Sequence, residues 1–547
     1  MLKTTYPNRL FLSFLTFFCC AVAYAQHITL PDLYDEGMTM QRGRNHTLQG
    51  ITSPGMTVEV KWQGKNYKAN ADRDGRFSIA IPTGKAGGPY ELKIGNRIIK
   101  NVFVGDVFLC SGQSNMELPM SRCEDLYRDI IDSYSNSQIH IVKTPRTFRL
   151  DEPNDIYSVK KNGASLWVEP KPENNGSIGA VTFFFAKKYN ETYGVPVGII
   201  NSSVGGSPVE AWISEDSLAK CQLYNNKLQM AKDADYVKAC QAMSAKSNQA
   251  WQGLAQKYIK DFEANNNVFG KEASSSADSN WQPTSLFSPD WARDAEGNIN
   301  GIHAFRKVIN VTAEQAAQGG LLRMGCIVDA DDIFVNGKHI GSTSYQYPPR
   351  KYKIPAGTLK AGKNIVYIRL TSYGGTPSFV TEKPYKIIFN NSEINLSSGW
   401  EYKLIQRMPS PQGAPDFMMT PAALYKGMLA PILDWGYSGA VWYQGESNVG
   451  QANEYEKMLK LLISDWRARV SEPLPFVIIQ LANFLHPQSP DQAAQQALRD
   501  AQCRVAETTP SCTWVYTGDL GEWNDIHPLQ KKEVGERVEV AFQKLLK

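Results

Sequence analysis

The chain has 547 residues, with 58 Lys and Arg against 54 Asp and Glu, which gives a formal net charge of +4. This near balance provides no electrostatic basis for binding nucleic acid or an anionic membrane. A chain of this length is too long for a single hydrophobic core, so we expect two to four domains.

The first 25 residues have the pattern of a cleaved secretory signal. Lys3 and Arg9 precede an apolar stretch over residues 10–23, and the small-residue motif AYA ends just before Gln26. This stretch is shorter than the roughly 20 residues that span a bilayer, and no later segment reaches that length. We therefore expect an exported protein, periplasmic or secreted, that does not enter a membrane; a retained anchor is the alternative.

Residues 26–100 are expected to form an N-terminal β-sandwich. Short strand-like runs such as VEVKW and YELKI are separated by SPG, RDG and AGG turns, a spacing typical of small β-domains. From residue 101 the strand-like run VFVGDVFLC is followed by helical stretches such as AVTFFFAKKYNETYG. Strands that alternate with helices predict βαβ units and a largely parallel sheet.

A second β-rich segment over residues 276–400 interrupts this α/β pattern. The polar stretch KEASSSADSN precedes it, and it contains the strand-like run KNIVYIRLTSY. The α/β pattern resumes with the helix EYEKMLKLLISDWRARV and the strand LPFVIIQLANF. We therefore expect one α/β domain, made of residues 101–275 and 401–547, that contains an inserted β-domain; four successive domains are the alternative.

Ser114 is the best candidate for a nucleophile. It falls where an apolar strand gives way to a helix, a turn that exposes side chains at the carboxyl edge of a parallel sheet. Its amide at the helix start is also suited to stabilise an oxyanion. Ser447 follows a strand too, but Gln444 and Glu446 crowd it, and Ser111 is expected to shape the turn. The alternative role for Ser114 is a helix N-cap.

A serine nucleophile needs a base, most often histidine. Of the seven histidines, His140, His486 and His527 lie in α/β segments. His527 follows Asp525 by two residues and precedes a helix that begins with proline, a setting in which a carboxylate can orient an imidazole. A surface Asp–His pair is the alternative; His140 is expected at a strand edge, and His486 stays open.

Four ordered segments resemble the sialate O-acetylesterase family, within the SGNH hydrolase superfamily. They are CSGQSNMELP, NSSVGGSPVEAWIS, AVWYQGESN and NDIHPLQKKEVGERV. The similarity extends to PDLYDEGMTMQR, PAALYKGMLAPIL and ALRDAQ, so it covers nearly all of the chain after residue 25. The resemblance implies a three-layer α/β/α catalytic domain and a galactose-binding-like β-sandwich over residues 276–400.

The resemblance also implies a catalytic triad in which Ser114 is the nucleophile, His527 the general base and Asp525 the residue that orients His527. The superfamily usually has D-x-x-H in this last block, whereas this chain has D-x-H, so a backbone carbonyl or Asp519 is an alternative partner of His527. The implied oxyanion donors are the amide of Ser114, the turn at Gly205 and Gly206, and Gln444, which stands where the superfamily usually has Asn.

The expected function is removal of O-acetyl groups from carbohydrates, most of all 9-O-acetylated sialic acids, without a metal or a cofactor. Arg499 is a candidate contact for the substrate's carboxylate, with a helix-surface ion pair as the alternative. Esters of xylan or pectin are alternative substrates, and a non-catalytic glycan-binding protein is the alternative of another class. The expected partner is a small molecule or a glycan, and the oligomeric state is not predicted.

Cysteine spacing offers no zinc site, because no CxxC or Cys/His pattern is present. Seven cysteines follow the expected signal segment, an odd number that leaves at least one unpaired. Cys503 and Cys512 are close enough in sequence to close a short disulfide loop, which is one alternative to free thiols.

Overall fold

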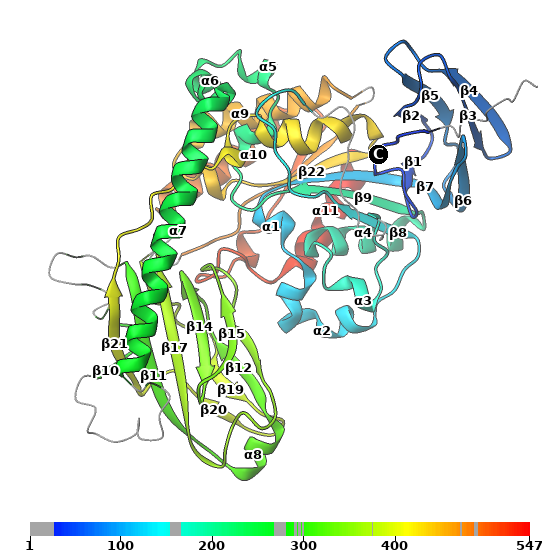
Figure 1. The fold of residues 1–547 in the computed structure, drawn as a ribbon. Coiled ribbons are helices and arrows are strands. Elements are labelled where there is room, and N and C mark those ends of the chain that lie inside the picture. Colours follow the sequence, from blue (N-terminus) through cyan, green and yellow to red (C-terminus); the bar gives the residue numbers. More distant parts are fainter. Residues whose placement is uncertain are drawn as a thin grey trace, which may run out of the picture.

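The computed structural model describes residues 27–153, 166–266, 268, 281–288, 291, 293, 297, 300–374, 376–470, 473–485 and 491–546. The expected signal segment, the polar stretch 271–280 and His486 lie outside them. The described chain is a mixed α/β structure with a central, mostly parallel sheet and several additional β-sheets (Figure 1).

Six parallel strands form the central sheet. In spatial order they are β8 (Ile139–Lys143), β9 (Val197–Ser203), β7 (Arg97–Gly112), β22 (Gly439–Tyr443), β23 (Phe476–Ile479) and β24 (Cys512–Val515). Their residues are mostly buried on both faces, as in parallel sheets that helices cover on both sides. The strands that precede Ser114 and Ser447 are β7 and β22, which are direct neighbours.

Helices pack on both faces of this sheet. The longer ones are α4 (Ala180–Tyr193) and α11 (Lys531–Leu545) on one face, with α9 (Ala452–Arg467) and its neighbour α10 (Gln492–Thr508) on the other. The Phe108 ring of β7 lies 4.9 Å from Phe185 and 4.8 Å from Phe542, which fixes α4 and α11 to the first face. On the second face, the ring of Trp442 in β22 packs against that of Trp466 in α9, with centroids 5.8 Å apart.

Shorter helical segments connect these elements. They are α1 (Ser114–Glu117), η1 (Met120–Cys123), α2 (Glu124–Ser133), α3 (Pro172–Asn175), η2 (Val209–Trp212), α5 (Glu215–Leu218), η3 (Gln222–Tyr224), α6 (Asn225–Lys232), η5 (Phe417–Met419), η6 (Tyr425–Leu429), η7 (Ala430–Trp435), η8 (Glu446–Asn448) and η9 (Gly518–Leu520). Two of them, α1 and η8, begin at the carboxyl edge of the sheet, directly after β7 and β22.

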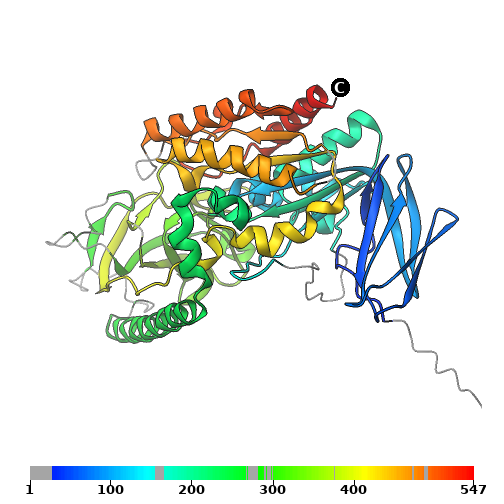
Figure 2. The ribbon, with the colours of Figure 1, turned by 90° about the horizontal axis from the view of Figure 1, so that it is seen from above.

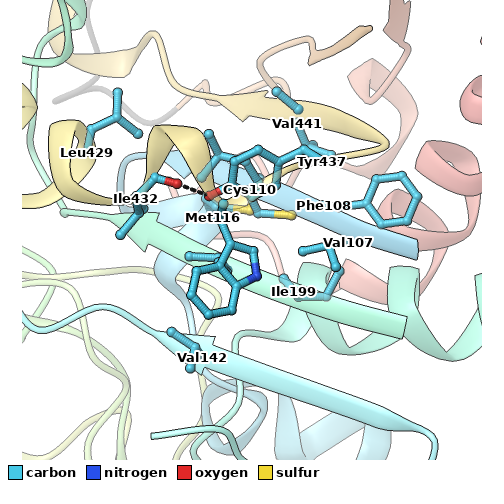
Figure 3. Packing of buried hydrophobic residues seen from close by; sticks show 14 of the residues in the cluster. Val107, Phe108, Cys110, Met116, Val142, Ile199, Leu429, Ile432, Tyr437 and Val441 are labelled. Carbon is cyan, nitrogen blue, oxygen red and sulfur yellow. Dashed lines mark hydrogen bonds between the residues drawn. The ribbon is translucent and has the colours of Figure 1, made fainter. Parts of the chain in front are cut away.

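The hydrophobic core of the central sheet is shown from close by in Figure 3. Side chains of β7, β8, β9 and β22 meet there with residues of η6 and η7. The hydroxyl of the buried Tyr437 donates to the carbonyl oxygen of Ile432 at 2.6 Å, which satisfies its one polar group. Each large side chain buried in this way stabilises the fold by about 1.5–3 kcal/mol relative to an exposed one.

The N-terminal β-region comprises β1 (Thr39–Gln41), β2 (Asn45–Ile51), β3 (Thr57–Trp62), β4 (Lys65–Asn70), β5 (Arg76–Pro82) and β6 (Gly87–Ile94). In β3 and β5 buried and exposed residues alternate, so each has one face toward the core and one toward solvent. β6 pairs with the first half of β7, and the second half of β7 belongs to the central sheet. One strand therefore crosses the domain boundary expected at residue 100.

The second β-rich region, called the inserted β-region below, has two larger sheets that share one hydrophobic core. The six-stranded sheet contains β10 (Gln282–Thr284), β21 (Trp400–Arg407), β11 (Gly301–Val311), β17 (Gly362–Ser372), β14 (Ala330–Val335) and β15 (Lys338–Thr343). The other contains β16 (Lys351–Ile354), β12 (Gly320–Met324), β19 (Tyr385–Ile388) and β20 (Glu393–Asn395). The remaining elements are the pair β13 (Ile327–Val328) and β18 (Ser378–Phe379), and α8 (Ala313–Gln318).

The two β-regions lie on opposite sides of the α/β unit (Figures 1 and 2). The long helix α7 (Ala234–Asn265) runs from the α/β unit to the inserted β-region. Its C-terminal half packs there through Phe262, which lies in one cluster with Trp281 and Tyr367.

The seven cysteines of the described chain are all free thiols, so Cys503 and Cys512 form no disulfide. None of the helices in the described ranges is both long and apolar enough to cross a membrane.

Candidate active site

The turn that carries Ser114 depends on a glycine. β7 ends at Gly112, whose φ of +137° is rarely adopted by other residues. A Cβ atom at Gly112 would lie 2.0 Å from the carbonyl oxygen of Tyr443 on the neighbouring strand. Gln113 then serves as the N-cap, and Ser114 is the first residue of α1. The sequence-predicted strand, turn and helix start are confirmed.

Ser114 lines a cavity of about 760 Å³ at the carboxyl edge of the sheet. His527, Gly205 and Gly206 line the same cavity, so the structure brings four of the expected site residues together. Their segments are far apart in the sequence. They meet because β7 and β9 end at the carboxyl edge of the sheet and the loop before α11 lies at the same edge.

His527 lies in the wall of the cavity with only 5% of its surface exposed. Burial, together with the nearby cations Arg122 and Lys531, lowers the pKa of His527 to about 3. The imidazole is therefore neutral at physiological pH and able to accept a proton. Its Nδ1 atom is buried and has no hydrogen-bond partner in the described chain.

No hydrogen bond joins the Asp525 carboxylate to the His527 ring in the described chain, although the resemblance implies that Asp525 orients this ring. The Asp525 carboxylate accepts the backbone N–H of His527 at 2.8 Å and lies 3.1 Å from Nζ of Lys383. Burial raises the pKa of this carboxyl, and the charge of Lys383 opposes that shift. Asp519 is no substitute, because both of its oxygens pair with Arg537 on the surface.

The amide of Gly205 is not available to an oxyanion, which corrects a second expectation. It donates to Oε2 of Glu117 at 2.9 Å. The same carboxylate accepts two hydrogen bonds from Arg146, at 3.1 and 2.7 Å, and lies 3.0 Å from Nζ of Lys143. Burial raises the pKa of Glu117, but these two cations together bring it below its usual value. Glu117 thus anchors the Gly205 turn as a charged group.

Gln444 also has a different role from the one expected. Its side chain is fully buried and is absent from the cavity lining. Its Nε2 donates to the carbonyl oxygen of Ser207 at 3.1 Å and to Oδ1 of Asn448 at 2.7 Å, which uses both of its hydrogens. Gln444 therefore holds the segment that follows the glycine turn, through Ser207, and does not face the cavity. The backbone amides of Ser114 and Gly206 remain without a partner among the contacts of the described residues.

Gln113 is a site residue that sequence reasoning missed. It lines the cavity, and its Oε1 accepts the backbone N–H groups of Gly445 and Ser447, both at 3.3 Å. Because both neighbours are donors, the other end of the side chain is the NH₂ group. The sequence signals were its position beside Ser114 and its place in the segment CSGQSNMELP.

Ser447 lines the cavity as well, but its hydroxyl is used structurally. It donates to the carbonyl oxygen of Gly206 at 2.9 Å. This bond holds the glycine turn against η8 and gives Ser447 a supporting role.

A buried polar unit lies behind Ser114. Asn115 donates to Glu446 at 2.5 Å and to the carbonyl oxygen of Ile526 at 3.0 Å, and it accepts from Lys531 at 2.6 Å. Lys531 is fully buried, and burial lowers its pKa to about 8. The unit ties α1 to the loop that carries His527. Its members lie in three of the four segments that resemble the family, which is the signal that could have identified them.

Arg499 is not among the residues that line the cavity. It lies on α10, where it donates to Gln496 of the same helix. The cations in the cavity wall are Arg122, Lys143 and Arg146. Within the described ranges, no group of three or more His, Cys, Asp or Glu side chains is placed to hold a metal ion.

The family model for carbohydrate esterases described as sialic acid-specific acetylesterases matches residues 104–268 and 418–543. Sialate O-acetylesterases from Pongo abelii and Homo sapiens are each 30% identical over 194 residues, which is 31% of this chain and 36% of theirs. These alignments thus span about a third of the relatives' length.

Among solved structures, a carbohydrate acetylesterase from Xanthomonas citri shares the fold, with a TM-score of 0.56 and 20% identity over 95% of this chain and 75% of that chain. The family match covers both segments that carry the candidate site residues. The chain belongs to the carbohydrate esterase family of sialic acid-specific acetylesterases.

Proposed function

We propose that this protein is a serine esterase that removes O-acetyl groups from carbohydrates. The observation that carries the proposal is the cavity in which Ser114, a neutral His527 and the unpartnered amides of Ser114 and Gly206 meet. A nucleophile, a base and preorganised N–H donors are the groups that acyl transfer requires.

In the proposed mechanism, Ser114 Oγ attacks the acetyl carbonyl while His527 accepts the hydroxyl proton. The oxyanion is held by the amides of Ser114 and Gly206, and each such donor lowers the barrier by about 3 kcal/mol. The C–O bond to the sugar breaks, and His527 returns the proton to the leaving sugar oxygen. Water, deprotonated by His527, then attacks the acetyl carbonyl. The bond to Ser114 Oγ breaks, His527 returns the proton to Oγ, and acetate departs. The mechanism uses no metal or cofactor.

Gln113 is the third oxyanion donor in this proposal, in place of Gln444. The support is its position in the cavity wall beside Ser114 and the two backbone N–H groups that fix the orientation of its amide. Asp525 acts in this scheme through the backbone of His527 and not through its ring.

The proposed substrates are 9-O-acetylated sialic acids. Relatives in the family carry the name sialate O-acetylesterase, and the cavity wall contains three cations. Glu117 pairs with Lys143 and Arg146, so Arg122 is the candidate for the sugar carboxylate in place of Arg499. Acetylated xylan or pectin is the alternative.

The domain organisation is part of the proposal. Residues 101–275 and 401–547 form an SGNH-type α/β/α domain, and residues 276–400 form a galactose-binding-like β-sandwich inserted into it. Support comes from the two-part family match and from the shared core of the two inserted sheets. Residues 1–25 are proposed to be a signal segment for export.

The first test is hydrolysis of p-nitrophenyl acetate together with labelling by a fluorophosphonate. Wild type and Ser447→Ala are expected to be labelled on Ser114, and Ser114→Ala is expected to lose both labelling and hydrolysis. Equal hydrolysis by wild type and Ser114→Ala would contradict the proposal, and wild type that binds glycans without hydrolysing the ester would favour a glycan-binding protein. Cleavage of acetylated xylan without cleavage of 9-O-acetyl sialic acid would overturn the sialate assignment alone.

A further inference from the structure

The inserted β-region reaches into the proposed active site. The segment between β15 and β16 contributes Tyr345, Tyr347 and Pro348 to the wall of the cavity that holds Ser114 and His527. These are the only cavity-lining residues from that region in the described chain. The rest of the wall comes from the α/β unit, so the cavity is shared between the two parts of the molecule.

We propose that this segment is the subsite for the sugar ring, and that the ring stacks on Tyr345. The inference rests on the proposed function, because it concerns the sugar whose acetyl group Ser114 would attack. A tyrosine offers an apolar face for the C–H bonds of a sugar and a hydroxyl for its polar groups. Binding pockets commonly combine such aromatic walls with a few polar groups.

Tyr345 has the exposure that a stacking residue needs. The residue is 53% exposed, and its ring centroid lies 6.5 Å from that of Tyr347 at an interplanar angle of 73°. The two rings therefore form a corner. Exposed aromatic side chains that line a concave site are favoured for ligand contact, since they cover a large area with few rotatable bonds.

Arg350 holds this corner in place. Its side chain is fully buried and donates to the carbonyl oxygens of Gln346, at 3.1 Å, and Pro348, at 2.7 Å, on either side of Tyr347. It also forms an ion pair with the buried Asp331 at 2.6 Å. A guanidinium with several acceptors in fixed directions makes the segment rigid, so little conformational entropy is lost when a sugar binds.

Tyr347 links the corner to the catalytic groups. Its ring lies against His527, with centroids 5.1 Å apart at 89°. Its carbonyl oxygen accepts from Nη2 of Arg122 at 3.4 Å and from Sγ of Cys326 at 3.3 Å. Because Tyr347 touches the proposed base, its replacement would alter catalysis directly, whereas Tyr345 reports on the sugar subsite.

Ion pairs next to the corner fix the inserted β-region to the α/β unit. Lys351 follows Arg350 and contacts Glu124 at 3.0 Å and Asp125 at 2.8 Å. Arg323 adds a bond to Asp125 at 2.7 Å. Both acids are at the start of α2, close in sequence to Ser114. The distance between the sugar subsite and the nucleophile is thus set by a polar interface.

The first experiment measures binding without turnover. Isothermal titration with 9-O-acetyl sialic acid and with an acetylated xylo-oligosaccharide would use Ser114→Ala and the double variant Ser114→Ala/Tyr345→Ala. We expect Tyr345→Ala to weaken binding of the preferred sugar about tenfold or more, and Tyr345→Phe to stay within about threefold of the parent. The matched control is Tyr516→Ala, since Tyr516 is 52% exposed and lies outside this cavity.

The second experiment is kinetic. In Tyr345→Ala with Ser114 intact, the ratio of kcat/KM for the acetylated sugar to kcat/KM for p-nitrophenyl acetate should fall about tenfold or more, mainly through KM. The sugar subsite would be overturned if Tyr345→Ala kept both the affinity for the sugar and this kcat/KM ratio within about twofold of the parent. It would also be overturned if Ser114→Ala bound neither sugar. Failure of the proposed function has another signature, which is hydrolysis that survives Ser114→Ala.

Discussion

The carboxylate of Asp525 lies between Nζ of Lys383, 3.1 Å away, and the backbone N–H of His527, 2.8 Å away. Lys383 belongs to the inserted β-region, whereas Asp525 and His527 belong to the loop before α11. Lys383 also contacts Glu522 at 3.1 Å. The inserted β-region therefore holds the loop of the proposed base through an ion pair that is almost entirely buried.

Lys383→Met is expected to destabilise the protein by about 3 kcal/mol, because it leaves the Asp525 carboxylate buried without its cation. Urea unfolding would measure the change, and kcat for p-nitrophenyl acetate should fall as the His527 loop loosens. Lys383→Met/Asp525→Asn should recover part of the stability. The control is Lys386→Met, which removes a solvent-exposed pair with Glu393 and should cost less than about 1 kcal/mol. Equal losses for both lysines would contradict the role assigned to Lys383.

The acid limb of the pH–rate profile should lie well below the ordinary histidine range. The pKa of His527 is lowered to about 3 by burial and by two nearby cations, so the base stays neutral at pH 5. The profile of kcat/KM for p-nitrophenyl acetate measures this directly. A limb centred near the unperturbed value of about 6.5 would contradict the buried placement of the ring.

Stability should fall as the pH drops from about 6.5 toward 4. His46, His140 and His527 have folded-state pKa values of about 4, 4 and 3, lowered mainly by burial. Below pH 6.5 the unfolded chain binds protons at these sites and the folded chain does not, so the free energy of unfolding decreases by up to about 1.4 kcal/mol per pH unit and group. His140→Phe should reduce that slope by about one proton, measured by urea unfolding at several pH values. An unchanged slope would show that His140 titrates alike in both states.

Gly112→Ala should abolish activity and destabilise the fold by more than about 3 kcal/mol, because the new Cβ meets the Tyr443 carbonyl at 2.0 Å and φ is +137°. Gly194→Ala is the matched control. Gly194 also has a positive φ, +63°, but open space surrounds it, so we expect a loss of about 1 kcal/mol and retained activity. Similar effects at the two positions would show that strain alone, without the close approach, explains the loss.

The two glutamines should behave differently. Gln113→Glu keeps an oxygen for the N–H groups of Gly445 and Ser447 and removes the proposed oxyanion donor, so kcat should fall about 10²-fold or more. Gln444→Leu removes bonds to Ser207 and Asn448 away from the cavity and should act mainly on thermal stability. A larger loss of kcat in Gln444→Leu than in Gln113→Glu would reverse this assignment.

Local pattern was sufficient for some of the site and not for the rest. The strand, turn and helix start around Ser114 could be predicted because apolar residues end abruptly at small and polar ones, a signal contained within a few positions. The prediction that Gly205 and Gln444 donate to the oxyanion was wrong, because their N–H groups bind Glu117 and Ser207 instead. These partners are set by packing between segments far apart in the chain.

Tyr345 and Tyr347 could not be identified from the sequence at all. No local pattern in the inserted β-region indicates that the segment after β15 folds back over a cavity lined by α1 and by the loop before α11. Similarly, the sequence predicts a domain boundary at residue 100 because short strand-like runs give way there to alternating strands and helices. In the structure β7 continues through this position as one strand of 16 residues.

That continuous strand has a consequence for protein engineering. Because β7 pairs with β6 at one end and carries the Gly112 turn at the other, excision of the N-terminal β-region would expose hydrogen-bonding groups on the strand that positions the proposed nucleophile. The N-terminal β-region thus supports β7 along its first half, and a chain shortened by this region would need a new partner strand for β7.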